Sequence, residues 1–143
     1  MSLFMIPFEI AFMDKNTLQM VEYYLEQFRK GNPYAFFGLL EMEHEILPEL
    51  MNAFRRERDG GVRNCLVEVI WQHRQPSVIP FLGEALRDPV PAVWKQALDG
   101  LVTLASPAAL AVLRAARTRQ QAPEFGLWLD EAIEQVESEI RKT

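Results

Sequence analysis

Residues 78–101 read VIPFLGEALRDPVPAVWKQALDGL, and this stretch decides the fold. Apolar side chains recur in it at steps of three and four residues, which is the spacing of one helix face. The run Asp88-Pro89-Val90-Pro91 interrupts the pattern with turn-forming residues. The stretch therefore predicts two short amphipathic helices joined by a tight turn.

Two further copies of this hairpin flank the first. The opening segment 78–82 matches 46–50 and 109–113, with shifts of 80 − 48 = 32 and 111 − 80 = 31 residues. The inward positions of the second helices align with shifts of 93 − 62 = 31 and 125 − 93 = 32 residues: Val62, Leu66, Val69 and Ile70, then Val93, Ala97, Gly100 and Leu101, then Phe125, Leu129, Ala132 and Ile133. Repetition at such a period predicts stacked helical hairpins that bury a common core.

The segment before the repeats predicts a capping hairpin. Apolar residues from Asn16 onward give a helix of about 14 residues that Gly31 ends, and Asn32-Pro33 then opens a second, short helix. The apolar run 1–13 is shorter than the roughly 20 residues of a membrane-spanning helix. We expect it to cover the apolar end of the fold, with docking on a partner or on a membrane surface as the alternatives.

These patterns predict an all-α protein, a right-handed α-α superhelix of about three helical hairpins with an N-terminal capping hairpin. The predicted organisation is a single domain over 1–143, with the cap at 1–44 and repeats at 45–75, 76–106 and 107–140. Leu66 and Leu82 fall on the packing faces of their helices, so we expect both in the core.

The repeated residues resemble the HEAT repeat, in particular the short bacterial version of phycobilisome-lyase-like proteins. The resemblance covers about Glu45 to Ile140. It implies a scaffold or recognition surface, and it implies that a turn Asp and a nearby Arg tie one repeat to the next. Asp59 and Arg63 fit this in the first copy, whereas Trp94 stands in the place of the Arg in the second. It also implies an alternative function as a bilin lyase or lyase chaperone.

The net charge of the chain indicates which class of partner molecule it suits. The formal net charge is −5 and the pI is near 5.1, so the chain is poorly suited to nucleic acid, whose binding depends on Lys and Arg. A HEAT-like DNA-repair glycosylase, which needs a basic groove, is disfavoured for the same reason. We expect a cytoplasmic bacterial protein with a basic protein partner and no membrane or nucleic-acid partner.

The sequence offers little for catalysis. His44, His73 and Cys65 do not have the spacing of a metal site, so we expect no enzyme activity and no cofactor. His73 follows the packing face and is expected as a hydrogen-bonded interior residue. Ser77 and Ser106 stand where helix caps are expected.

Two arginine clusters near the ends of first helices, at 55–58 and 114–119, are expected to stabilise those helix ends, with phosphate or nucleic-acid binding as the alternative.

The outward positions of the second helices give the predicted partner site. Glu68, Asp99 and Glu131 occupy equivalent positions and form an acidic column, with Trp71 expected to project beside it. Trp94 and Lys95 lie on the flank. We expect this concave face to bind a basic protein, as an adaptor or as an immunity-type inhibitor of a basic effector.

Overall fold

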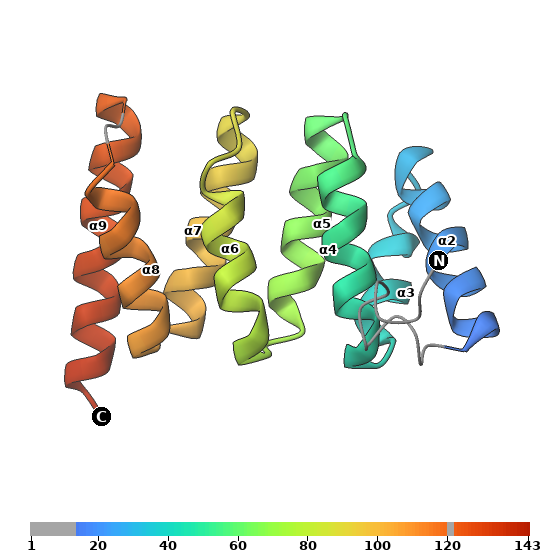
Figure 1. Cartoon of the computed structure of the whole chain (residues 1–143), viewed down its shortest axis with the longest axis horizontal. Coiled ribbons are helices and arrows are strands. Elements are labelled where there is room, and N and C mark those ends of the chain that lie inside the picture. The colour runs from blue at the N-terminus through green and yellow to red at the C-terminus, as the bar shows by residue number, and fades with distance from the viewer. Residues whose placement is uncertain (1–13, 120–121) are drawn as a thin grey trace, which may run out of the picture. The chain divides into compact units, whose positions relative to one another are not determined.

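The computed structural model describes residues 14–119 and 122–143, so the expectation for the run 1–13 lies outside the described residues. The described part of the chain contains eight α-helices, two 3-10 turns and no strand, which confirms the all-α prediction (Figure 1). The elements in chain order are α2 (Lys15–Arg29), α3 (Tyr34–Glu41), η2 (His44–Ile46), α4 (Leu47–Arg56), α5 (Gly60–Gln72), η3 (Pro76–Val78), α6 (Ile79–Ala85), α7 (Pro91–Leu104), α8 (Pro107–Arg117) and α9 (Pro123–Arg141).

The chain divides into two compact units, Met1–His73 and Arg74–Thr143. The division falls beside the predicted repeat boundary between residues 75 and 76. Each predicted repeat contains the expected pair of helices, α4 with α5, α6 with α7, and α8 with α9. The single-domain organisation and the handedness of the superhelix stay predictions.

The first unit opens with the capping hairpin α2–α3. Asp14 caps α2 by accepting a hydrogen bond from the Thr17 backbone N–H at 2.8 Å. Gly31 follows the end of α2 and has φ +78°, a conformation that glycine adopts without steric cost. The Asn32 side chain accepts from the Tyr34 N–H at 3.0 Å, at the start of α3. The predicted capping hairpin is confirmed.

The turn between α4 and α5 is fastened by the two residues that the resemblance singles out. Asp59 caps α5 by accepting from the Val62 N–H at 3.0 Å. Arg63 donates from Nη1 to the carbonyl oxygens of Glu57 at 3.1 Å and Arg58 at 2.8 Å. These contacts hold the turn of their own hairpin. The expected tie to the next repeat stays a prediction.

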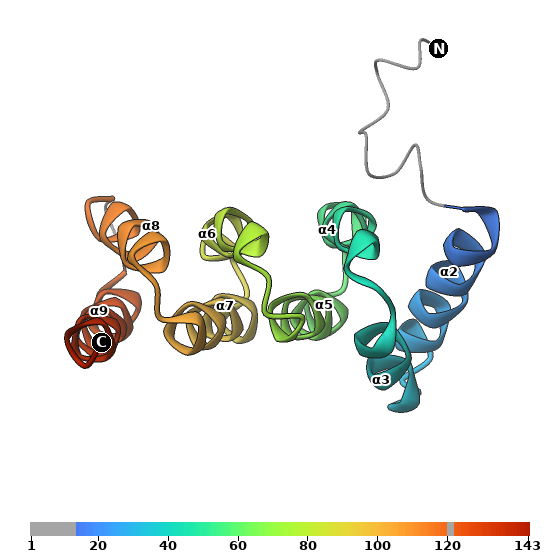
Figure 2. The same cartoon turned by 90° about the horizontal axis from the view of Figure 1, so that it is seen from below.

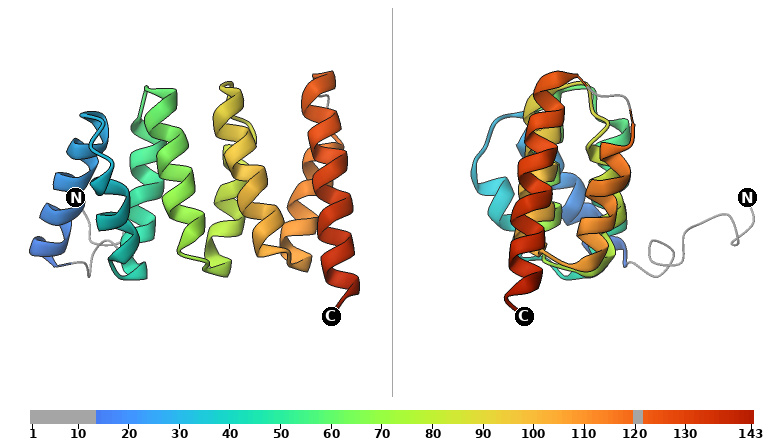
Figure 3. Two further views of the ribbon diagram at one scale, coloured as in Figure 1. Left: turned by 180° about the vertical axis from the view of Figure 1, so that it is seen from behind. Right: turned by 90° about the vertical axis from the view of Figure 1, so that its left-hand side faces the viewer.

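The second unit consists of two helical layers. In Figure 2, α6 and α8 form one layer and α7 and α9 form the other, and Figure 3 shows α7 and α9 side by side. Ser106 caps α8 as expected, because its Oγ accepts from the Ala109 N–H at 3.1 Å. The expectation for Ser77 is wrong. This residue lies inside η3, which begins one residue earlier at Pro76, and Gln75 holds the N-cap position.

The predicted core positions are mostly confirmed. Leu66 and Leu82 are fully buried, and so are the inward positions of α7. Val62 in α5 and Ile133 in α9 are half-buried, so the packing faces of these two helices lie slightly differently from the predicted ones.

Candidate functional site

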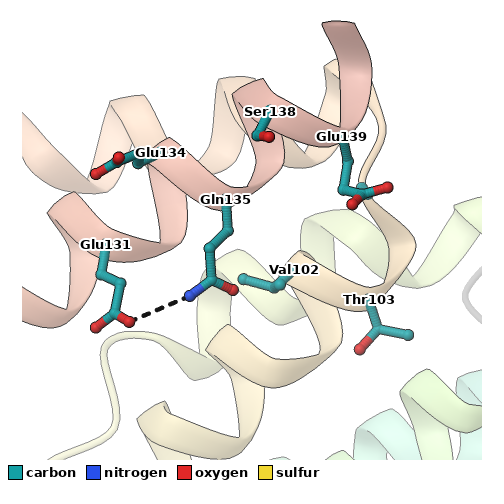
Figure 4. A pocket seen from close by; sticks show the side chains of 8 residues that line it. Val102, Thr103, Glu131, Glu134, Gln135, Ser138 and Glu139 are labelled. Carbon is teal, nitrogen blue, oxygen red and sulfur yellow. Dashed lines mark hydrogen bonds between the residues drawn. The ribbon is translucent and has the colours of Figure 1, made fainter. Parts of the chain in front are cut away.

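An open groove runs between α7 and α9 in the second unit (Figure 4). Its volume is about 620 Å³. The lining residues are Val102 and Thr103 of α7, Ala105 at its end, and Glu131, Glu134, Gln135, Ser138 and Glu139 of α9. Because α9 buries Leu129, Ala132 and Val136 on its packing face, these polar residues lie outside that face and remain free to line the groove.

The groove is acidic. Three of its eight lining residues are glutamates and none is a cation. Glu131 accepts a hydrogen bond from the Gln135 side chain at 3.3 Å. The carboxylate of Glu139 forms an ion pair with Lys142 at 2.9 Å. Such a surface attracts positively charged groups.

Asp99 lies on α7 about one helical turn before Val102 and is exposed, as predicted. Partial burial of its carboxyl raises the pKa of Asp99. Asp99 and Glu131 are therefore both surface acids of the second unit, but only Glu131 lines the groove. Glu134 and Glu139 complete the acidic groove.

Trp94 and Lys95 form a stacked cluster near the start of the same two helices. Trp94 is only 8% exposed and packs against Phe125, with ring centroids 4.7 Å apart. The Lys95 Nζ lies 4.8 Å above the Trp128 ring and 3.5 Å from a Glu124 oxygen. Trp94 is therefore largely a core residue rather than the exposed flank that the sequence predicted.

The exposed apolar surface beside this cluster belongs to Leu127, 71% exposed, and Trp128, 41% exposed. The sequence pattern gave no role to Trp128. No signal pointed to Trp128, because the aligned positions in the earlier copies are Cys65 and Gln96. Only the packing of α7 on α9 brings Trp128 to Lys95.

The expected outward projection of Trp71 is wrong. Trp71 is 9% exposed and counts among the buried residues of α5. The reason is helical spacing, since Val67, Ile70 and Trp71 stand at i, i+3 and i+4 and extend the apolar face of this helix.

Glu68, the third acid of the predicted column, lies in the first unit and is half-buried. It lines an apolar hollow of about 320 Å³ at the α2–α3 turn, together with Cys65 and four aromatic or proline side chains, Phe28, Pro33, Phe36 and Phe37. Burial raises the pKa of the Cys65 thiol, and the charges of Glu68 and Asp59 add to this effect. The thiol is thereby kept protonated, the less nucleophilic form.

His73 is a hydrogen-bonded interior residue, as predicted. It is 6% exposed, its Nε2 lies 3.1 Å from the Leu39 carbonyl oxygen, and its Nδ1 lies 3.0 Å from Nδ1 of His44. Because a carbonyl only accepts, His73 carries its proton on Nε2 and His44 donates from Nδ1. Burial lowers the pKa of His73, and the nearby His44 adds to this shift.

The two arginine clusters are engaged largely within their own units. Arg56 pairs with Glu49 at 3.3 Å, and Arg55 donates to the Asn52 side chain at 3.0 Å. Arg114 pairs with Glu137 at 2.7 Å and Arg117 with Asp130 at 2.5 Å, so both tie α8 to α9.

Within residues 14–119 and 122–143, no group of three or more His, Cys, Asp or Glu side chains is placed to hold a metal ion. Among the described helices, none is both long and apolar enough to cross a membrane.

Comparison with known proteins and protein families places the chain in a family. Neither the curated proteins nor the solved structures contain a match to this chain. The family model of HEAT repeats matches residues 47–128, from the start of α4 into α9. That span is more than half of the chain and contains all three predicted hairpin turns, so the chain belongs to the HEAT-repeat family.

Proposed function

We propose that this protein is a non-catalytic binding module that holds a basic protein segment in the acidic groove between α7 and α9. The observation that carries the proposal is the stripe of carboxylates from Glu131 to Glu139, with no cation among the residues that line the groove. HEAT repeats generally mediate protein–protein interaction.

The shape of the groove suits lysine or arginine. Val102 supplies an apolar floor on which the aliphatic part of such a side chain packs, while the charged end reaches Glu131 or Glu134. Each exposed charge pair contributes only about 0.2–1 kcal/mol. The carboxylates therefore contribute to the selection of a positively charged partner and to its rate of association more than to the affinity of the complex.

An apolar anchor lies on the same side of α9. Leu127, Glu131, Glu134 and Ser138 are spaced by four, three and four residues and so share one helix face. The exposed Trp128 stands next to Leu127 and is positioned by Lys95. Aromatic side chains dominate the energetics of many interfaces, so the preferred partner offers an apolar residue beside its basic ones.

Both an adaptor and an immunity-type inhibitor of a basic effector would use such a face. The bilin-lyase alternative gains no support from Cys65, because the raised pKa of this thiol disfavours the reactive thiolate.

Fluorescence anisotropy tests the proposal with a short labelled peptide of Lys, Leu and Ser. We expect saturable binding that weakens as salt rises, and no binding of a matched peptide with Glu in place of Lys. The triple variant Glu131→Gln, Glu134→Gln and Glu139→Gln should weaken binding at least about tenfold, or 1.4 kcal/mol.

The matched control is Glu22→Gln, Glu41→Gln and Glu43→Gln, which removes the same charge from exposed positions of the first unit. This control should retain wild-type affinity. Equal losses in both triple variants would show that net charge alone attracts the peptide, and the groove would not be the binding site.

A further inference from the structure

Two arginines follow the ends of the first helices in the second unit. Arg87 follows the C-cap residue of α6, and Arg119 follows the C-cap residue of α8. Their backbone N–H groups donate to the carbonyl oxygens of Glu84 at 3.0 Å and Ala116 at 3.2 Å, so both lie in a hydrogen-bonded turn that follows their helix. Because α6 and α8 pack side by side, both arginines line the same two hollows.

This pair differs from three cations that belong to α7 and α8 themselves. Arg114, Arg117 and Lys95 each have a carboxylate partner on α9. Over residues 14–119 and 122–143, the side chains of Arg87 and Arg119 make no ion pair and no hydrogen bond. Burial lowers the pKa of Arg119, and the positive charge of Arg87 lowers it further. Two like charges held close together favour an anion between them.

The hollow on one side of the pair has an aromatic wall. Its volume is about 410 Å³, and Trp94 and Phe125 line it together with Pro89 and Pro91. It also contains two carboxylates, but both have other partners. Asp88 accepts from the Val90 N–H at 2.9 Å, and Glu124 pairs with Lys95 at 3.5 Å.

The hollow on the other side measures about 390 Å³. It is lined by the same two arginines, by the acidic residue Glu84, and by Pro80, Gly83, Val112 and Ala115. The pair therefore forms a positive ridge between two cavities, one of which suits a flat ring.

We propose that Arg87 and Arg119 together bind an oxyanion, a phosphate or a carboxylate, carried by a ligand whose apolar ring enters the hollow lined by Trp94 and Phe125. A guanidinium offers two parallel N–H donors to either oxyanion, and two guanidiniums satisfy its remaining lone pairs. This site is separate from the groove between α7 and α9, so it does not depend on the proposed function.

Nitrogen-15 NMR of the arginine Nε–H groups tests the site on the full chain. The probes are phenyl phosphate, phenylacetate, inorganic phosphate and, as the uncharged comparison, benzyl alcohol. We expect saturable shifts of the Arg87 and Arg119 signals with at least one ring-bearing oxyanion, weaker shifts with inorganic phosphate and none with benzyl alcohol. The tighter of phenyl phosphate and phenylacetate identifies the preferred oxyanion.

The variants Arg87→Gln and Arg119→Gln should each weaken the tighter probe at least tenfold. Arg114→Gln, which removes a paired arginine of the same helix, should leave its affinity unchanged. Thermal unfolding of the unliganded Arg87→Gln and Arg119→Gln proteins should show no loss of stability, since neither side chain bonds to the protein. The proposal is overturned if neither ring-bearing oxyanion gives saturable shifts, if benzyl alcohol binds equally well, or if Arg114→Gln weakens binding as much.

Discussion

Helices α5 and α9 are both second helices of their repeats, yet the residues at one aligned position differ in their burial. Trp71 in α5 is buried, whereas Glu134 in α9 is exposed and lines the acidic groove. The difference begins one turn earlier, where α5 carries Val67 and α9 carries Asp130. In α5 the apolar residues Val67 and Trp71 together widen the packing face, whereas α9 carries an acid at both aligned positions.

In α7 the residue at this aligned position has intermediate burial. This residue is Val102, which is half-buried and forms the floor of the groove, and Leu98 stands one turn before it. The same repeat position thus serves as core, as groove floor and as groove wall in the three copies. Family membership establishes the helices but not the role of this position.

The largest expected effect comes from truncating the buried tryptophan. Trp71→Ala should lower the free energy of unfolding by about 3–5 kcal/mol, because it removes a large core side chain. Trp128→Ala should cost much less, since this ring is 41% exposed. Urea denaturation followed by circular dichroism measures both. Similar costs would contradict the contrast between the two helices.

A smaller effect is expected at the end of α7. Ala105 adopts φ +39°, a left-handed conformation that is unfavourable for any residue with a Cβ atom. Ala105→Gly should raise the free energy of unfolding by about 0.5–1 kcal/mol.

The control for Ala105 is Ala111→Gly, at an exposed position inside α8, which should lower stability by about the same amount. A loss of stability in both variants would show that Ala105 is not strained.

The smallest effect concerns pH and is confined to the first unit, which contains both histidines. Because burial lowers the pKa of His73, the unfolded chain binds a proton at this residue more readily than the folded chain. Stability that is fully present above the unfolded pKa of about 6.5 is therefore lost as pH falls toward the folded value.

Urea denaturation at pH 7 and pH 5 measures this loss. His73→Gln removes the titrating ring but keeps a donor for the Leu39 carbonyl, so the variant should lose less stability over this range. Parallel losses in the two proteins would assign the pH dependence to other groups.

The sequence predicted the helices well and the site only in part. The repeat shifts placed α4 to α9 correctly, and Asp59, Ser106 and Gly31 mark helix boundaries through local hydrogen bonds or backbone conformation. Glu131 and Asp99 were correctly assigned to the surface, because the outward side of α7 and α9 follows from simple periodicity. The prediction for Trp71 is wrong because Val67 extends the packing face of α5 toward Trp71.

By itself, the sequence determined the helical hairpins, their turns and the acidic character of the outward side, because these depend on residues within about four positions of one another along the chain. Tertiary structure alone decided which distant residues meet. The His44–His73 pair, Lys95 over Trp128 and the Arg87–Arg119 ridge each join residues from different helices or turns. Periodicity specifies the side of a helix on which a residue lies, whereas the neighbour on that side depends on how the helices pack.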